Sequence, residues 1–215
     1  AHLEGLKTLE NIREEKGDLY GTMSRSGVAV FNADDEAMAP LRRLWTGRTV
    51  TYGVISQADL TASDIAKEGV AGQSFRLNCG PDSVSVRLSA SGMHNIYNAL
   101  AAAALSRASG LGIDKISQGL RNFRPVTARF EIHCLPNGAF LVDDTYNANP
   151  ASVREALKTI QTLKGSSRSV AILGDMLELG PSAEQLHEAV GLEAAATDVG
   201  RLYLKGPLSR STAAG

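Results

Sequence analysis

A short apolar run, Ala139 to Val142, is followed by a polar turn, Asp143 to Pro150, and then by an amphipathic helical pattern. A strand that passes directly into a helix is typical of α/β proteins, whose ligands bind at the carboxyl ends of the strands. Asn149 can cap the helix, and Pro150 can occupy its first position. The other polar side chains of the turn have no evident folding role, so the sequence predicts a binding site there.

The chain beyond residue 127 is predicted to alternate strands with helices, which favours a parallel sheet with right-handed crossovers. Arg124 to Thr127 breaks the preceding helical pattern. We therefore place a domain boundary there, between domains 1–126 and 127–215. The elements expected in the second domain are a hairpin with strands 130–135 and 139–142, helices at 153–160 and 183–196, a buried strand 169–173 and a strand 202–204.

The first domain contains the clearest helix of the chain, because apolar residues recur on one face from Met93 to Ala108 and Gly110 can end it. Other segments alternate in polarity, as half-buried antiparallel strands do. These alternating segments are 63–66, 74–78 and 84–88. The remaining expected elements are strands 28–31 and 50–55, and helices 3–16, 36–44 and 115–123.

Composition excludes several classes of protein. The net charge of −1 gives no reason to expect binding to nucleic acid or acidic lipid. Cys79 and Cys134 are expected to be reduced and structural. No apolar run reaches the roughly 20 residues that cross a bilayer, and no signal peptide is visible, so we expect a cytoplasmic protein without membrane insertion. The chain lacks an initial methionine and stops soon after a predicted strand, and we expect it to be a fragment cut at both ends.

Two amides lie near the start of the clearest helix. Asn95 and Asn98 are three residues apart, so they share a face of the helix, and that face is not the apolar one. Paired amides suit a flat ligand with donors and acceptors, such as a nucleobase. The alternative is that one amide caps the helix and both face solvent.

Four further residues have both a functional and an ordinary explanation. Arg129 follows the boundary and could bind a phosphate with its planar guanidinium, or be an ordinary surface arginine. Asp175 follows a strand and a glycine, which suits either a site or the capping of the next turn. Composition alone favours ordinary solvent exposure for His2 and Lys16.

Three motifs are missing from the sequence. It contains no G-x-x-x-x-G-K-[ST] loop for phosphates. The pair Gly110 and Gly112 ends a helix instead of opening one, so it is not a dinucleotide fingerprint. No group of cysteines and histidines has zinc-site spacing.

Taken together, several segments resemble the Mur ligases of peptidoglycan synthesis. HN-x-x-N and the arginine after the boundary are shared across that family, whereas DDTYNANP and GDMLELG are particular to the branch that adds D-Ala-D-Ala. The resembling segments cover nearly the whole chain in the family's order. They are AHLEGLKTLENIREEKGD, VAVFNADD, SGMHNIYNALAAAALS, RPVTARFEI, LVDDTYNANPAS and VAILGDMLELG.

This resemblance implies a fold and a reaction. The chain would hold the later part of a central ATPase domain, with a mixed sheet, helices and a small antiparallel sheet, and most of a Rossmann-like C-terminal domain. The reaction would use ATP and Mg²⁺ to join D-Ala-D-Ala to UDP-N-acetylmuramoyl-tripeptide through an acyl phosphate, in a cytoplasmic monomer. The phosphate loop would lie upstream of this chain, which would be inactive by itself.

The resemblance also implies roles for individual residues. His2 would lie near the magnesium site, and Lys16 would be carbamylated, which turns it into a carboxylate-like ligand for a hard metal. Asn95 and Asn98 would lie near the adenine. Arg129 would contact the nucleotide phosphates.

Within the polar turn, Asp144 would bind the ribose. Tyr146, Asn147 and Asn149 would lie where the substrate and ATP meet, without individual roles. The family also implies that closure of a mobile C-terminal domain brings Arg129 and Asp144 to the nucleotide.

Two alternatives stay open. The first is another Mur or folylpolyglutamate-type ligase, which would add a different amino acid or act on a folate. The second is a non-catalytic module that binds a nucleotide weakly and hydrolyses nothing. The amino acid that the full-length protein accepts, and the presence of a phosphate loop before Ala1, distinguish these alternatives from the D-Ala-D-Ala ligase.

Overall fold

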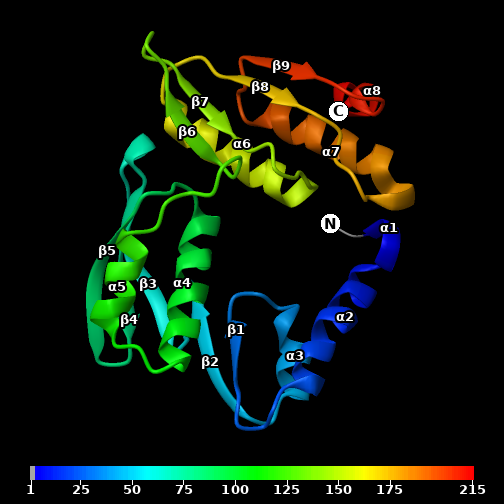
Figure 1. The fold of residues 1–215 in the computed structure, drawn as a ribbon. Helices are drawn as coiled ribbons and strands as arrows, with labels where there is room; N and C mark the ends of the chain where they lie inside the picture. The colour runs from blue at the N-terminus through cyan, green and yellow to red at the C-terminus, as the bar shows by residue number, and fades with distance from the viewer. Residues whose placement is uncertain (1–2) are drawn as a thin grey trace. The chain divides into compact units, whose positions relative to one another are not determined.

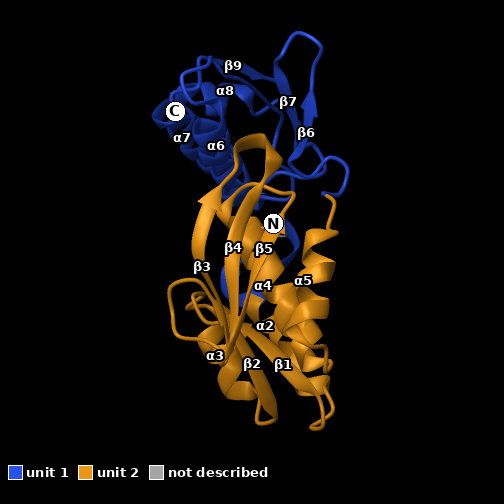
Figure 2. Cartoon of the chain, turned by 90° about the vertical axis from the view of Figure 1, so that its left-hand side faces the viewer, with its two compact units in different colours: residues 1–12, 125–215 blue, residues 13–124 orange. Residues whose placement is uncertain are grey.

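A computed structural model describes residues 3–215 of the chain. The contacts between residues divide it into two compact units, one of residues 13–124 and one that joins residues 1–12 to residues 125–215 (Figure 2). This division by contacts does not define domains, so the domain boundary that we place between residues 126 and 127 stays a prediction. None of the helices in the described part of the chain is long and apolar enough to span a bilayer.

Within residues 13–124, five strands form one mixed sheet in the order β1-β2-β3-β4-β5. The neighbours β1 and β2, and β2 and β3, are parallel, whereas β3, β4 and β5 are antiparallel. Only two residue pairs join β2 to β3, so the parallel and the antiparallel parts of the sheet are connected over a short stretch. The strands are β1 Val28–Asn32, β2 Arg48–Gly53, β3 Leu60–Lys67, β4 Gln73–Cys79 and β5 Asp82–Leu88.

Helices cover this sheet because each strand has apolar residues for them to contact. The helices α4, Met93–Ala108, and α5, Ile113–Arg121, pack on the antiparallel part and on one face of β1 and β2 (Figure 1). Alanines at 103 and 104 in α4 are fully buried, since small side chains let the helix approach the sheet closely. The bounds of α4 confirm the predicted helix 93–108.

A second cluster lies on the opposite face of β1. Ala29 and Phe31 belong to it, whereas Val30 between them packs with α4, as the alternation of a strand requires. The helices α2, Leu9–Thr22, and α3, Met38–Leu44, contribute Tyr20 and Leu41 to the same cluster. The rings of Tyr20 and Phe31 stack with their centroids 5.0 Å apart.

The other unit contains two small sheets, each of two strands, among its described residues. β6 and β7 form the predicted antiparallel hairpin, and β8 and β9 are parallel. Leu157 and Ala194 pack with Ala171 of β8, so helices cover one face of that pair. The elements are β6 Glu131–Cys134, β7 Phe140–Asp143, α6 Pro150–Lys164, β8 Val170–Leu173, α7 Ala183–Ala196, β9 Arg201–Leu204 and α8 Ser209–Ala214, with short 3-10 turns at Gly69–Ala71 and Gly180–Ser182.

Three details of the sequence prediction are wrong. The strand at 169–173 is not buried, because Val170 is 55% and Ile172 is 75% exposed on the face that the helices leave open. The helix expected over 3–16 is interrupted between α1, Leu3–Leu6, and α2, since Lys7 adopts a left-handed φ of 66°. The helix α8 was not predicted, and it packs closely on Gly191 of α7.

Candidate functional site

The polar turn after β7 is folded by its own side chains. Oδ1 of Asn149 accepts hydrogen bonds from the N–H groups of Ala151 and Ser152, at 3.1 and 3.0 Å, and caps α6 as predicted. Oγ of Ser152 accepts in return from the N–H of Asn149, which completes a capping box. Oδ1 of Asn149 is thus used in folding, which leaves its Nδ2 as the group that can face a ligand.

Other residues of the turn also have a folding role, which the sequence did not reveal. Oδ1 of Asp143 accepts from the N–H and from the hydroxyl of Thr145, at 3.1 and 2.7 Å. This is a local Asx-type turn, so the expectation that these polar groups have no role in folding is wrong for both residues. Asn147 accepts from the N–H of Ala148 at 2.8 Å.

Asp144 and Tyr146 tie this turn to the segment that contains Arg129. Oδ1 of Asp144 accepts from the N–H of Phe130 at 3.0 Å, and the N–H of Tyr146 donates to the carbonyl of Ala128 at 3.0 Å. Ala128 and Phe130 have left-handed φ angles of 60° and 52°. Such residues cost about 1 kcal/mol or more each and persist where surrounding contacts determine them. The backbone on both sides of Arg129 is therefore fixed by the polar turn.

The side chain of Arg129 is held by the same turn. Its guanidinium carbon lies 4.0 Å from the centroid of the Tyr146 ring, and both side chains are exposed. A cation–π contact at an exposed site contributes about 0.5–1 kcal/mol, enough to favour one orientation of the guanidinium. We call Arg129, Asp144 and Tyr146 the arginine cluster. The structure thus brings Arg129 together with two residues of the polar turn, which the sequence predicted as a separate site.

The two amides of α4 also lie together, in the unit of residues 13–124. Nδ2 of Asn95 donates to the carbonyl of Ser91 at 2.8 Å and lies 2.9 Å from Nε2 of His94. Nδ2 of Asn98 donates to Oδ1 of Asn95 at 3.4 Å, a long hydrogen bond. The predicted shared face is confirmed. Asn95 is half-buried and its amide is anchored, whereas Asn98 is exposed.

A carboxylate that the sequence did not single out contacts the same helix, α4, through Tyr97. Asp34, two residues after β1, accepts from the N–H groups of Val54, Ile55 and Ser56 at 2.6, 3.1 and 2.6 Å. Its Oδ2 also accepts from the hydroxyl of Tyr97 in α4 at 2.9 Å. We call this arrangement the Asp34 clamp. The signals in the sequence are the position of Asp34 after a strand and its place in the segment VAVFNADD, which resembles the Mur ligases.

The environment of the clamp shifts the pKa values of its two side chains. Burial raises the pKa of Asp34, but the hydrogen bonds from Val54, Ile55 and Ser56 outweigh that effect and hold it well below its usual range. Burial, followed by the hydrogen bond and charge of Asp34, raises the pKa of Tyr97 to about 12. At neutral pH the pair is thus a carboxylate that accepts and a phenol that donates.

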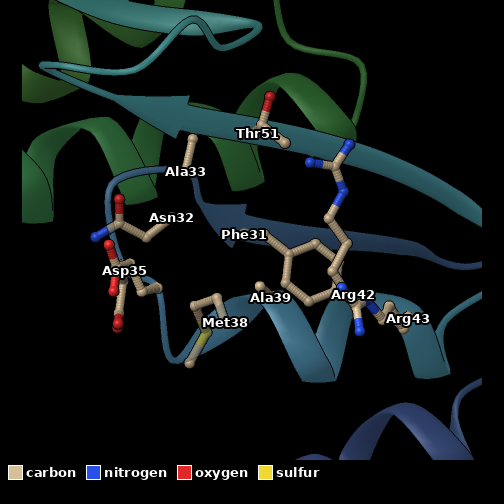
Figure 3. A pocket seen from close by; sticks show the side chains of 10 residues that line it. Phe31, Asn32, Ala33, Asp35, Met38, Ala39, Arg42, Arg43 and Thr51 are labelled. Atoms are coloured by element: carbon tan, nitrogen blue, oxygen red, sulfur yellow. The ribbon is translucent and has the colours of Figure 1, made fainter.

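A surface hollow of about 570 Å³ lies between β1 and α3 (Figure 3). The Phe31 ring lies in its middle, Arg42 extends toward Thr51, and Asn32 lies at the other end. None of the residues that the sequence predicts for a site lines it. Its shape therefore gives no support to the predicted nucleotide contacts, which rest on the two polar clusters.

The predicted metal-site residues Lys16 and His2 stay proposals, and Asp175 has a folding role. Lys16 is exposed on α2, and His2 lies outside the described residues. Within residues 3–215 no three His, Cys, Asp or Glu side chains come close enough to hold a metal ion. Asp175 accepts from the N–H of Leu208 at 3.2 Å, which favours a folding role, although not in the turn next to it.

Comparison with known proteins identifies the family. The family model of the Mur ligase middle domain matches residues 1–106, and that of the Mur ligase glutamate ligase domain matches residues 128–214. The chain belongs to the Mur ligase family. The first match includes the amides of α4 and the Asp34 clamp, and the second includes the arginine cluster. Both polar regions are therefore parts of Mur ligase domains.

Individual Mur ligases extend this result. The UDP-N-acetylmuramoyl-tripeptide–D-alanyl-D-alanine ligase of Escherichia coli K12 is 35% identical over 100% of this chain and 48% of its own length. A crystal structure of MurF from Acinetobacter baumannii superposes with a TM-score of 0.92 at 28% identity, covering 100% of this chain and 46% of that one.

A further structure, MurF from Thermotoga maritima in complex with ADP, has a TM-score of 0.85 at 24% identity, over 99% of this chain and 48% of that one, and supports the fold alone. The chain spans about half the length of the curated relatives it matches. The expected α/β fold of Mur ligase domains is thus confirmed, and tests of activity belong to the full-length protein.

Proposed function

We propose that the full-length protein that contains this chain is an ATP-dependent ligase that joins D-Ala-D-Ala to UDP-N-acetylmuramoyl-tripeptide. The observation that carries this proposal is the match, along the entire chain, to relatives that bear this name. The polar turn 143–150, which the resemblance links to this branch of the family, forms one ordered structure with Arg129.

The nucleotide contacts follow from the two polar regions. We assign Asn95 and Asn98 to the adenine, because amides on one helix face can pair with its donors and acceptors. We assign Asp144 to the ribose, because a carboxylate can accept from hydroxyl groups. Oδ1 of Asp144 also accepts from the N–H of Phe130, which holds the carboxylate in place.

Arg129 is the residue that we assign to the phosphates. In the proposed reaction the terminal carboxylate of the tripeptide attacks the γ-phosphate of ATP and forms an acyl phosphate, with loss of ADP. The amine of D-Ala-D-Ala then attacks the acyl carbon, and phosphate leaves. The first step brings anionic oxygens together, and a guanidinium held in place beforehand offsets their repulsion without reorganising. The Tyr146 ring and the fixed backbone would supply that preorganisation.

Tyr146, Asn147 and Asn149 complete the set of proposed substrate contacts. Tyr146 holds Arg129, and its ring is 65% exposed, so it can also touch a ligand. Nδ2 of Asn149 is available to donate, because its Oδ1 caps α6. We propose that these groups meet the substrate side of the nucleotide.

Magnesium, His2 and Lys16 also remain proposals. A carbamylated Lys16 would offer the oxygen ligands that a hard cation prefers. Within residues 3–215 no three His, Cys, Asp or Glu side chains form a metal site, and we assign no step to the metal. The proposal that the enzyme acts as a monomer in the cytoplasm is tested by light scattering and by cell fractionation.

The decisive experiment supplies the purified full-length protein with ATP, the UDP-linked tripeptide and one amine at a time. We expect phosphate release with D-Ala-D-Ala and none with D-Glu or a diamino acid. Release with D-Glu or a diamino acid would favour another ligase of the superfamily. ATP binding without release in any mixture would favour a non-catalytic nucleotide-binding module.

A further inference from the structure

The Asp34 clamp joins three segments that are distant in the sequence. Asp34 lies in the turn after β1, its backbone donors Val54 to Ser56 follow β2, and Tyr97 belongs to α4. Four hydrogen bonds thus converge on one carboxylate. Bonds to an ionised acceptor are about twice as strong as neutral ones. The clamp is therefore a strong connection between α4 and the ends of two neighbouring parallel strands.

Tyr97 lies between the two amides in the sequence of α4. A side chain that is fixed at its tip restricts the rotation of the helix about its own axis. That rotation sets the direction in which Asn95 and Asn98 point, because they lie within one turn of Tyr97. The apolar face of α4 also restrains the helix, since Ile96 and Leu100 are fully buried. The clamp consequently adjusts the orientation of a helix that is already packed.

We propose that Asp34 and Tyr97 are positioning residues, which act through α4 to aim the amides of Asn95 and Asn98 at a purine base. The inference rests on the proposed contact of these amides with adenine. It goes further, because it assigns the precision of base recognition to residues that do not themselves touch the nucleotide. Neither residue was predicted for the site.

The chain offers a matched control in the same connection between β2 and β3. Oδ2 of Asp59 accepts from the N–H and the hydroxyl of Thr51, both at 2.8 Å. Asp59 therefore ties the same loop to β2, and its hydrogen bonds go to Thr51 and not to α4. Loss of Asp59 should loosen the loop without altering the direction of the amides.

The test measures ATP and GTP binding to the full-length protein by calorimetry, because binding can be read whether or not the ligase reaction occurs. We expect Tyr97→Phe, which removes only the hydroxyl, to weaken ATP binding about 3- to 10-fold. This is less than the full effect of a hydrogen bond to a charged group, because Tyr97 acts on the base through α4. The preference for ATP over GTP should fall by a similar factor. Asp34→Asn should act in the same direction, and Asp59→Asn should leave the preference within about twofold.

Thermal unfolding of each variant is measured in parallel. If Tyr97→Phe lowers stability but leaves ATP affinity and base preference unchanged, while Asn95→Ala and Asn98→Ala weaken ATP binding, the positioning role is wrong and the adenine contact stands. If the asparagine variants also bind ATP normally, both the adenine contact and this inference are wrong. Should Asp34→Asn fail to fold, Tyr97→Phe decides the question alone.

Discussion

The arginine cluster and the Asp34 clamp fix their side chains by different means. In the arginine cluster, the guanidinium is exposed and is held by one aromatic contact and by a backbone with two left-handed residues. In the clamp, one half-buried carboxylate accepts four hydrogen bonds, and neither Asp34 nor Tyr97 has a left-handed φ. The first arrangement leaves a charged group available to a ligand, and the second uses its charge inside the fold.

This difference supports our proposal that the arginine cluster meets the ligand and that the clamp supports the site. A carboxylate that is surrounded by donors has little capacity left for a substrate, so the clamp suits positioning. An exposed arginine with a fixed backbone retains all its donors for an anion. If this comparison is correct, substitutions in the arginine cluster should change reaction rates, and substitutions in the clamp should change stability and base recognition.

The largest effect is expected for Arg129→Ala in the full-length enzyme. Loss of a charge contact that operates in the transition state lowers kcat by about 10²-fold or more. Arg129→Lys keeps the charge without the planar fork and should recover only part of the rate. Steady-state kinetics of phosphate release measure both variants. An Arg129→Ala enzyme with the normal kcat would contradict the assigned role and the comparison.

Asp34→Asn should have the next largest effect, on stability. The replaced oxygen becomes an N–H₂ donor that faces backbone donors, so the free energy of unfolding should fall by about 1.5–3 kcal/mol near neutral pH. The folded pKa of Asp34 is lower than its unfolded value, so its charge stabilises the fold above the unfolded pKa. This contribution is lost as the pH falls through the folded value.

The difference in melting temperature between the original protein and Asp34→Asn should therefore be greatest near neutral pH and shrink below about pH 4. Thermal melts across that range, read by circular dichroism, give the comparison. A difference that stays constant at all pH values would mean that the charge of Asp34 does not contribute, and that shape alone explains the loss.

The part of the fold that could be predicted is the part with a long periodic pattern. The helices α4 and α7 have the predicted bounds because apolar residues recur over at least 14 residues in each. The predicted burial of β8 was wrong. The sequence shows that a strand is apolar, but it does not show which face of the strand is covered by helices. The helix α8 was missed because Ser209–Ala214 has almost no apolar pattern.

The arginine cluster and the Asp34 clamp also differ in how far a local sequence pattern could predict them. Arg129, Asp144 and Tyr146 fall within 18 residues of one another, and a polar turn between a strand and a helix marks two of them. The partners of Asp34 lie 20 to 63 residues further along the chain. No local pattern can reveal such a convergence, so only the folded structure identifies the clamp.

A smaller effect is expected for Asp144→Ala, which should weaken ATP binding about 10-fold if the carboxylate contacts the ribose, since a hydrogen bond to a charged group contributes about 1.5 kcal/mol or more. Affinity for the UDP-linked tripeptide should change less. Asp144→Asn retains an acceptor for the N–H of Phe130 and controls for the loss of that bond. Calorimetry measures the affinity of each variant for ATP and for the UDP-linked tripeptide. An equal loss of affinity for both ligands would refute the ribose contact.

The smallest effect is expected for Tyr146, and it tests how the arginine cluster holds its cation. Tyr146→Phe keeps the ring under Arg129, whereas Tyr146→Leu keeps an apolar side chain without a π system. The contact contributes about 0.5–1 kcal/mol, so Tyr146→Leu should lower kcat about 2- to 5-fold, and Tyr146→Phe should be close to normal. The KM for ATP should change little, because the orientation of the guanidinium matters most in the transition state, when charge develops on the phosphate oxygens. Equal kcat values for the two variants would show that the backbone alone positions Arg129, and the left-handed residues beside it would then carry the whole preorganisation.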